Sequence, residues 1–420
     1  MSSGILRALR HRNYRLFFFG QGLSLVGTWM QQVAMSWLVY RLTGSALLLG
    51  VVAFSGQLPT FILAPVAGVL VDKRSRHRIL LVTQSLALLQ AATLAVLVAS
   101  GQATTERLVL ISLFLGVVSA FDVPARQSFV VEMIDRRDDL PNALALHSTI
   151  FNGARLIGPT VAGIVIALWG EWVCFLLNAA SYVPILIALG AMRFGYSSHH
   201  TAPHGGVAEL LASVPRELRE GLGYAYRLVP IRWTLALLAL TSVLGMSHTT
   251  ILPVIAREVL GGGPRTLGFL VGASGLGALA AALVMASRRT VADLAQKIAA
   301  ACFLYSASLA AFAFSRSTAL SLGLMFVTGF GVMVQMVATN TLLQTVVEDR
   351  MRGRVMSLYT MALIGMSPFG SLLTGTLAAR AGAPGAILFG AAGSALAAAA
   401  FASRLGRLQA ALPSKELSDF

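Results

Sequence analysis

The feature that most constrains this fold is a series of apolar stretches, each long enough to cross a lipid bilayer. A membrane-spanning helix needs about 20 mostly apolar residues, and the mean hydropathy of the whole chain is +0.76. No alternating ten-residue pattern suggests a β-barrel, so the sequence predicts an all-α membrane protein. Twelve stretches qualify as transmembrane helices: 16–40, 46–71, 79–99, 107–131, 141–169, 172–192, 231–256, 265–286, 296–314, 318–345, 354–378 and 384–404.

Composition excludes the other broad classes of protein. Only 12% of the residues are charged, whereas a soluble domain averages about 25%. Cys174 and Cys302 are far apart in apolar stretches, so they form neither a disulfide scaffold nor a metal or redox motif. The first apolar stretch is too long for a signal peptide and lacks a small-residue cleavage site, so we expect it to act as an uncleaved anchor.

The basic residues are distributed unevenly between the two sets of loops. One set carries 25 Lys and Arg, the opposite set carries 6, and Arg155 lies inside a span. Because cytoplasmic loops are the basic ones in multi-pass proteins, the split predicts a protein of the bacterial cytoplasmic membrane with both termini in the cytoplasm. It also accounts for the net charge of +15 as a surface facing the lipid bilayer. The loops are too short for the clustered basic face that nucleic-acid binding requires.

A long polar break divides the spans into two groups of six. We expect an N-terminal six-helix bundle at 1–192, a cytoplasmic linker at 193–230, a C-terminal six-helix bundle at 231–405 and a tail at 406–420. The linker contains a predicted amphipathic helix on the membrane surface, from Glu209 to Arg227. Its three histidines lack an acidic or Cys partner at ligand spacing, which favours a polar linker over a metal site. The histidines are His199, His200 and His204.

The two halves resemble each other, as in transporters built from parallel repeats. A glycine pair in span five, Gly158 and Gly163, recurs 212 residues later in span eleven as Gly370 and Gly375. The fold class predicted is therefore twelve transmembrane helices in two pseudo-symmetric six-helix bundles.

The loop between spans two and three resembles the G-x-x-x-D-x-x-x-R signature of the major facilitator superfamily. It places Gly68, Asp72 and Arg76 at the cytoplasmic end of span two. We expect Gly68 to let a neighbouring helix approach closely. The resemblance implies that Arg76 pairs with an acid near the cytoplasmic end of span four, and Asp122 is the candidate. This relay would latch the outward-open state. The alternative is that the loop carries only topogenic charge.

Span five resembles the antiporter motif of the exporters in this superfamily. The matching residues are Gly153, Gly158, Pro159 and Gly163, with Ala162 where the pattern has a Gly. Pro159 can bend the helix. The resemblance favours export over import. Further stretches are similar to the branch that contains the enterobactin exporter and the transmembrane secretion effectors, and they lie at 12–17, 27–32, 121–127 and 219–232.

Polar residues at membrane depth are candidates for function because they are costly there. In the family, spans one, four, seven and ten line a central cavity, with help from two and five. Arg155 is the one basic residue near a span centre, and three roles stay open: attraction of an anionic or carbonyl-rich substrate, a pair with Asp122 in the empty cavity, and a structural salt bridge. The expected cavity residues are Gln21, Gln31, Gln32, Arg126, Asn152, Arg155, His248 and Asn340.

Three residues are candidates for proton coupling: Asp122, His147 and His248. Asp122 could instead be the latch acid or the structural partner of Arg126, four residues away on the same helix face. The two histidines have a suitable intrinsic pKa of about 6.5, and the alternative for each is a hydrogen-bonded core or cavity residue. No Asp or Glu lies deeper in the N-terminal half than Asp122, which departs from many proton-coupled drug exporters.

These features together predict a secondary exporter of a small organic molecule, siderophore-like or amphipathic and drug-like. The resemblance implies alternating access, proton antiport, a monomer and no cofactor. The alternatives are an importer of a polar metabolite and a lipid-handling or enzymatic membrane protein. A primary pump is disfavoured because the chain has no G-x-x-x-x-G-K-[ST] motif.

Overall fold

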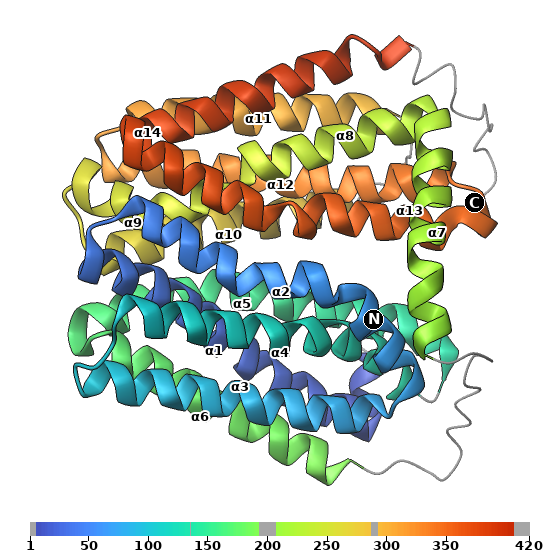
Figure 1. Cartoon of the computed structure of the whole chain (residues 1–420), viewed down its shortest axis with the longest axis horizontal. Helices are drawn as coiled ribbons and strands as arrows, with labels where there is room; N and C mark the ends of the chain where they lie inside the picture. Colours follow the sequence, from blue (N-terminus) through green and yellow to red (C-terminus); the bar gives the residue numbers. More distant parts are fainter. Residues whose placement is uncertain (1–5, 135, 193–206, 287–292, 407–420) are drawn as a thin grey trace.

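The computed structural model describes residues 6–134, 136–192, 207–286 and 293–406 as a bundle of long helices (Figure 1). Side chains are not described at Pro65, Asp72, Arg137 and 207–215. The first and last described segments lie at the same end of the bundle (Figure 1), which we name the terminal end. The other end is the distal end.

The first half of the chain forms six long helices that pack mainly against one another. A short 3-10 helix, η1 (Arg7–Arg10), precedes them, and a second, η2 (Arg137–Asp139), separates the fourth from the fifth. The long helices are α1 (Arg12–Thr43), α2 (Ala46–Lys73), α3 (Arg76–Ala99), α4 (Thr105–Glu132), α5 (Leu140–Trp169) and α6 (Glu171–Ala191).

The second half begins with α7 (Val207–Arg227) and contains several interrupted helices. The remaining segments are α8 (Val229–Leu244), η3 (Met246–Ile251), α9 (Leu252–Val254), η4 (Ile255–Val259), α10 (Pro264–Ala286), α11 (Leu294–Phe314), α12 (Thr318–Val346), α13 (Asp349–Thr360), η5 (Met361–Gly365) and α14 (Ser367–Ala402).

The described helices account for the predicted spans. Ten segments are long and apolar enough to cross a membrane, and one of them, 349–402, has 54 residues and turns back at Gly382, whose φ is 75°. That segment supplies two spans, and the 32-residue α1 supplies one more. The predicted break between spans five and six is confirmed, because Gly170 adopts a φ of 85° between α5 and α6.

Spans seven and eleven depart from the prediction of one regular helix each. Span seven is α8 followed by the 3-10 segment η3, the short α9 and the π-helical η4. Span eleven is α13, the π-helical η5 and the first part of α14. Hydropathy averaged over a span does not reveal such breaks, because 229–259 still forms one apolar segment although η3 and η4 include His248, Arg257 and Glu258.

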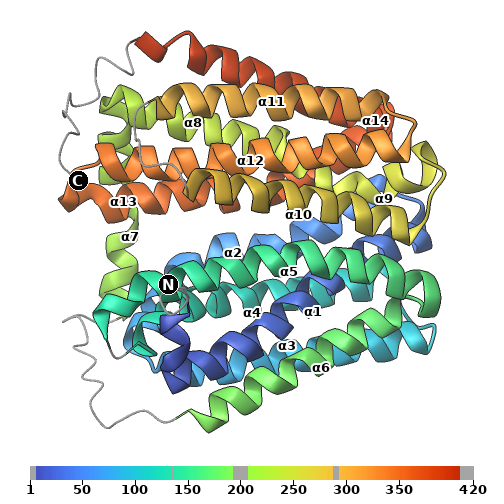
Figure 2. The same ribbon diagram turned by 180° about the vertical axis from the view of Figure 1, so that it is seen from behind.

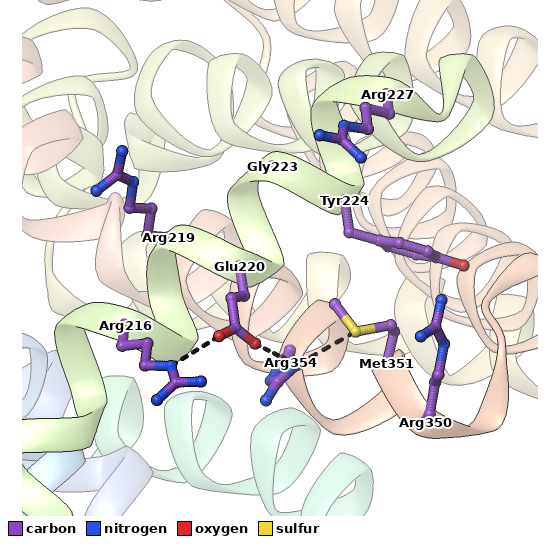
Figure 3. A pocket seen from close by; sticks show the side chains of 9 residues that line it. All are labelled: Arg216, Arg219, Glu220, Gly223, Tyr224, Arg227, Arg350, Met351 and Arg354. Carbon is purple, nitrogen blue, oxygen red and sulfur yellow. Dashed lines mark hydrogen bonds and ion pairs between the residues drawn. The ribbon is translucent and has the colours of Figure 1, made fainter.

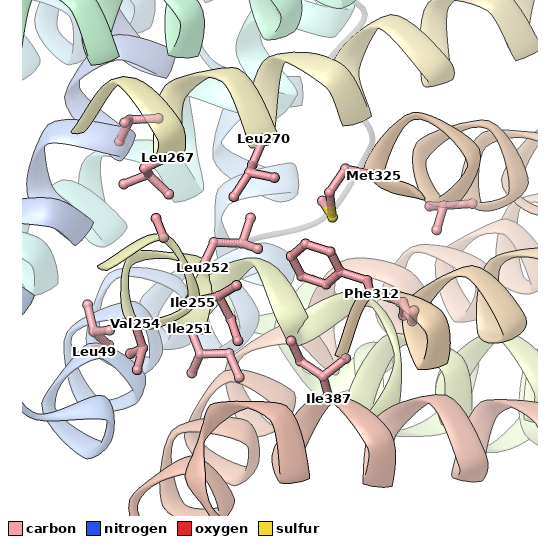
Figure 4. Packing of buried hydrophobic residues seen from close by; sticks show 14 of the residues in the cluster. Leu49, Ile251, Leu252, Val254, Ile255, Leu267, Leu270, Phe312, Met325 and Ile387 are labelled. Atoms are coloured by element: carbon pink, nitrogen blue, oxygen red, sulfur yellow. The ribbon is translucent and has the colours of Figure 1, made fainter. Parts of the chain in front are cut away.

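The apolar cores distinguish the two ends of the bundle. One large cluster contains buried residues of both halves near the distal end, such as Leu49 of α2, Leu252 of α9 and Leu267 of α10 (Figure 4). Toward the terminal end the halves have separate clusters, one around Phe17 and Phe129 and the other within the second half. The halves therefore share a core at the distal end only.

The helix α7 runs across the bundle at the terminal end, nearly perpendicular to the spans (Figure 1). It packs mainly against α13 and α8 of the second half and also touches α2 of the first half. A helix is present where the sequence predicts the amphipathic helix of the linker, and its location on a membrane surface stays a prediction. The predicted linker residues 193–206 and the tail from 407 onward lie outside the described part of the chain.

Candidate functional site: a central polar site between two halves

Glycines bring the two halves together near the distal end. A Cβ atom added to Gly163 of α5 would lie 2.7 Å from the carbonyl oxygen of Pro264, and one added to Gly50 of α2 would lie 2.8 Å from that of Ser371. Small residues permit such close helix packing in a membrane. Figure 2 shows α5 beside α10 along this contact. The distal end is closed in this conformation.

The glycines of the antiporter-like motif in span five differ in how closely neighbouring helices approach them. A Cβ on Gly158 would lie 2.6 Å from the Cβ of Trp29 on α1, so Gly158, like Gly163, permits close packing with a neighbouring helix. Pro159 lies within α5, which continues through it. A Cβ on Gly153 would meet nothing within 4 Å.

The expectation for Gly68 is wrong in this conformation. A Cβ there would also meet nothing within 4 Å, so no neighbouring helix approaches closely. The physical reason is position: Gly68 lies toward the terminal end, where the two halves do not share a core.

Each interruption packs against a regular helix of the other span: η5 of span eleven against α8, and η3 of span seven against α14. Ser242 of α8 donates a hydrogen bond to the carbonyl oxygen of Leu363 in η5 at 2.7 Å, and Thr250 of η3 donates to Ser371 of α14 at 3.1 Å. Broken helices in transporters and π-bulges in general are concentrated at functional sites. The break in span seven holds His248, whose Nδ1 is 2.7 Å from the carbonyl oxygen of Gly245. Its buried Nε2 has no hydrogen-bond partner among the described atoms.

Arg155 of α5 faces this region from the first half. Its guanidinium carbon lies 5.7 Å from the centre of the Trp29 ring, and Trp29 in turn makes an edge contact with Phe151. Arg155 is within electrostatic range of His248. No carboxylate of the described residues forms an ion pair with it. The salt bridge proposed between Arg155 and Asp122 is therefore absent from this conformation.

Asp122 belongs instead to a polar network inside the first half. Its Oδ1 accepts hydrogen bonds from Thr83 at 2.9 Å and from Gln84 at 2.7 Å, and its Oδ2 lies 3.6 Å from Arg126. The i,i+4 pair of Asp122 and Arg126 predicted from the sequence is present. Asp122 is buried, and its partners lie on α3 and α4.

The acid that pairs with Arg76 is Glu132, which corrects the prediction of Asp122. Arg76 begins α3 and Glu132 ends α4, so both lie at the terminal end. Asp122 is ten residues earlier on α4, or about 15 Å deeper at 1.5 Å per residue. The side chain of Asp72, the third member of the predicted relay, lies outside the described residues.

The cavity position predicted for Gln31 is also wrong. Gln31 donates to Gln90 of α3 at 3.0 Å and accepts from Asn178 of α6 at 2.8 Å. These bonds lie in the interior of the first half, because α1 packs against α6 and the amide of Gln31 reaches α3. The adjacent Gln32 is exposed.

The remaining predicted residues have varied surroundings. Gln21 is buried with neither side-chain atom hydrogen-bonded within the described structure. Asn152 donates to the carbonyl oxygen of Ser148 within α5. His147 stacks on Phe17, with ring centres 6.3 Å apart. The amide of Asn340 on α12 accepts from Gln344, one turn along the same helix.

Several polar contacts were not predicted. In the second half, Gln335 donates to Thr241 at 3.0 Å. At the distal end Tyr40 of α1 hydrogen-bonds to Glu258 of η4, which joins the two halves, and Arg41 pairs with the buried Glu171 at 2.6 Å. A systematic search for amides inside predicted spans would have found Gln335. The described residues hold no group of three His, Cys, Asp or Glu that could bind a metal ion.

Comparison with curated proteins identifies bacterial transporters as relatives. The chain is 28% identical to the staphyloferrin A transporter of Staphylococcus aureus over 367 residues, which covers 86% of this chain and 88% of the relative. It is 26% identical to the multidrug efflux pump Tap of Mycolicibacterium fortuitum, over 87% of this chain and 89% of that one.

Solved structures agree on the fold. The peptide transporter POT superposes with a TM-score of 0.76 over 95% of each chain at 12% identity, and the nucleoside transporter NupG with 0.68 over 95% of this chain and 99% of its own at 15% identity. The sequence profile described as transmembrane secretion effector matches residues 3–418, nearly the whole chain. The chain, a multi-pass secondary transporter and not an enzyme, belongs to the transmembrane secretion effector family of the major facilitator superfamily.

Proposed function

We propose that the protein exports a small organic molecule from the bacterial cytoplasm by alternating access, in exchange for protons. The terminal end is then the cytoplasmic end, in agreement with the 25 to 6 distribution of basic residues between the loops. The substrate class we assign is a siderophore-like compound with an anionic or carbonyl-rich group that contacts Arg155, or an amphipathic drug-like compound. The similarity to the staphyloferrin A transporter supports the first type, and the similarity to the multidrug efflux pump Tap supports the second.

The observation that carries this proposal is the unneutralised charge of Arg155. An arginine in the middle of a spanning helix is costly, and burial of a charge is normally compensated by an ion pair. Here the described carboxylates pair elsewhere, Asp122 with Arg126 and Glu132 with Arg76. A substrate carboxylate or a row of carbonyl oxygens would supply the missing partner, while Trp29 and Phe151 offer ring faces and edges to its apolar part.

The packing of the halves supports a loading step from the terminal end. The shared apolar core, the glycine contacts of Gly50 and Gly163, and the bond between Tyr40 and Glu258 all close the distal end. Release on the distal side requires these contacts to separate. In the proposed cycle the terminal end then closes, with Arg76 and Glu132 as the first charged pair to rearrange.

Proton coupling is assigned to Asp122. It is the deepest carboxylate of the first half, and it accepts bonds from Thr83 and Gln84 that a protonated carboxyl could keep through its carbonyl oxygen. Protonation would remove the charge that faces Arg126 and loosen α4 from its present arrangement. His248 is the second candidate, because its Nε2 has no described partner.

The test uses energised inverted membrane vesicles, with ΔpH as the readout. Carboxylate siderophores and amphipathic cations such as ethidium are added to wild-type and Arg155→Gln vesicles. We expect a siderophore to collapse the gradient in wild type and to leave it intact in the variant. A gradient that no compound perturbs would contradict proton antiport, and a siderophore-induced collapse that is equal in wild-type and Arg155→Gln vesicles would contradict the role of Arg155.

A further inference from the structure

A strongly basic pocket lies between α7 and α13 at the terminal end, remote from the central site. It encloses about 630 Å³ and is lined by five arginines and one glutamate (Figure 3). Arg216, Arg219 and Arg227 come from α7, and Arg350 and Arg354 come from α13. We propose that this pocket binds the phosphate group of an anionic lipid headgroup. This inference does not depend on the transported substrate.

The charges that line the pocket are not balanced within the described structure. Glu220 pairs with Arg216 at 3.0 Å and with Arg354 at 2.8 Å (Figure 3), and these arginines hold the pKa of its carboxyl below the ordinary value, the hydrogen bond from Arg216 first. Glu348 at the rim pairs with Arg350 at 2.8 Å. Neither Arg219 nor Arg227 has a described acidic partner. The lining therefore keeps a large positive excess.

The donor geometry suits a phosphate. A guanidinium offers parallel N–H groups that bind two oxygens of one phosphate at once, which an ammonium cannot do. The hydroxyl of Tyr224 lies among the arginines and accepts a hydrogen bond from the backbone N–H of Glu348 at 3.3 Å, so its own proton is available for donation. A phosphate would bridge α7 and α13 where they now share the single carboxylate of Glu220.

The neighbouring aromatic residues indicate that the pocket lies at headgroup level. Tyr226 directly precedes Arg227 and is 70% exposed, and the guanidinium of Arg232 lies 5.0 Å from its ring centre. Trp233 is flanked by Arg232 and Arg404 at 6.0 Å and 5.5 Å. Tyrosine, tryptophan and arginine gather at the membrane–water interface, and basic pockets at the cytoplasmic ends of spans suit anionic lipids. This placement favours a lipid over a soluble phosphate compound.

The binding test uses the full-length protein purified in a neutral detergent. Short-chain phosphatidylglycerol is titrated, with phosphatidylcholine of the same chain length and inorganic phosphate as separate arms, and the unfolding temperature gives the apparent affinity. Arg350→Ala combined with Arg354→Ala removes two donors. Arg15→Ala combined with Arg78→Ala is the matched control, because both residues are exposed at the same end and outside the pocket.

We expect the pocket variant to bind phosphatidylglycerol roughly 30-fold more weakly, since each basic residue near an anionic lipid surface contributes about fivefold. The control should bind as wild type does. Glu220→Gln should bind more tightly, because it removes the internal competitor for Arg216 and Arg354. A gain of affinity cannot arise from misfolding.

Four results would overturn the proposal. Equal losses in the pocket variant and the control would show a response to net charge alone. Equal binding of phosphatidylcholine, which carries the same phosphate group but no net charge, would exclude selection of an anionic headgroup. An unchanged affinity of the pocket variant would exclude recognition of the lipid in this pocket. Saturation by inorganic phosphate with the same affinity as the lipid would overturn the lipid assignment and indicate a soluble phosphate compound.

Discussion

Replacement of Arg155 by Gln should impair binding of an anionic substrate strongly while the fold stays intact. The guanidinium lies at the centre of α5, above Trp29, with no described acid as partner. A hydrogen bond to a charged group contributes about 1.5–3 kcal/mol. Its loss therefore weakens binding roughly 10- to 150-fold, because about 1.4 kcal/mol corresponds to tenfold in affinity.

The same substitution should have little effect on stability or raise it. It removes a charge whose burial at the middle of a span costs about 2.5–3.5 kcal/mol, and it loses a cation–π contact worth about 0.5–2 kcal/mol. Arg126→Gln is the matched comparison in the neighbouring span. It leaves the buried carboxylate of Asp122 without its charged partner, so it should lower the free energy of unfolding by about 1–3 kcal/mol.

The assay pairs thermal unfolding of purified protein with transport in vesicles, using a carboxylate siderophore and ethidium. We expect Arg155→Gln to lose siderophore transport, to keep a wild-type unfolding temperature and to keep ethidium transport. Loss of both substrates together with a lower unfolding temperature would refute the reasoning, because Arg155 would then be a structural residue.

Three further predictions follow from other contacts. Gly163→Val should open the distal end, because its Cβ would lie 2.7 Å from the carbonyl oxygen of Pro264; labelling of cysteines introduced on the distal side should rise, and unchanged labelling would contradict the closure described. Arg76→Ala and Glu132→Gln should each shift the equilibrium between the distal-closed and distal-open conformations in the same direction, by about 0.2–1 kcal/mol. The shift in the double variant should be no larger than that in either single variant, whereas additive shifts would exclude a direct pair. The hydrogen bond with His11 is the main cause of the lowered pKa of Asp139. Asp139 should therefore hold η1 in place above about pH 4, the pKa of an unfolded Asp, and this stabilisation should be lost as the pH falls through the lower pKa of the folded state. Asp139→Asn should expose η1 to proteolysis at pH 7, and equal proteolysis of wild type and variant would show that the pair is dispensable.

Hydropathy and charge patterning were sufficient to predict where the helices lie, but not where a helix is interrupted within a span. Span lengths and the break at Gly170 follow from local composition and from the turn preference of glycine, which are properties of a few adjacent residues. The interruption of span seven around His248 depends on contacts of η3 with α14, which are distant in sequence. A local pattern contains no information about such contacts.

The site residues show the same limit. The face of α1 that carries Gln31 was predicted to line a cavity because it is polar, but polar stripes also serve networks inside a bundle, here with Gln90 and Asn178. Likewise, Asp122 was chosen as the partner of Arg76 by resemblance, while depth along α4 selects Glu132. Arg155 could be singled out from the sequence alone, since an arginine at mid-span is rare, and its role in binding stays a prediction.

The direction of transport is the central claim, and vesicles of opposite orientation test it most directly. A labelled carboxylate siderophore is offered to inverted and to right-side-out vesicles, each with an imposed pH gradient, and uptake is compared between wild type and Arg155→Gln. The account predicts uptake into inverted vesicles with an acidic lumen, loss of that uptake in the variant and none in right-side-out vesicles. Uptake confined to right-side-out vesicles would contradict export and identify an importer.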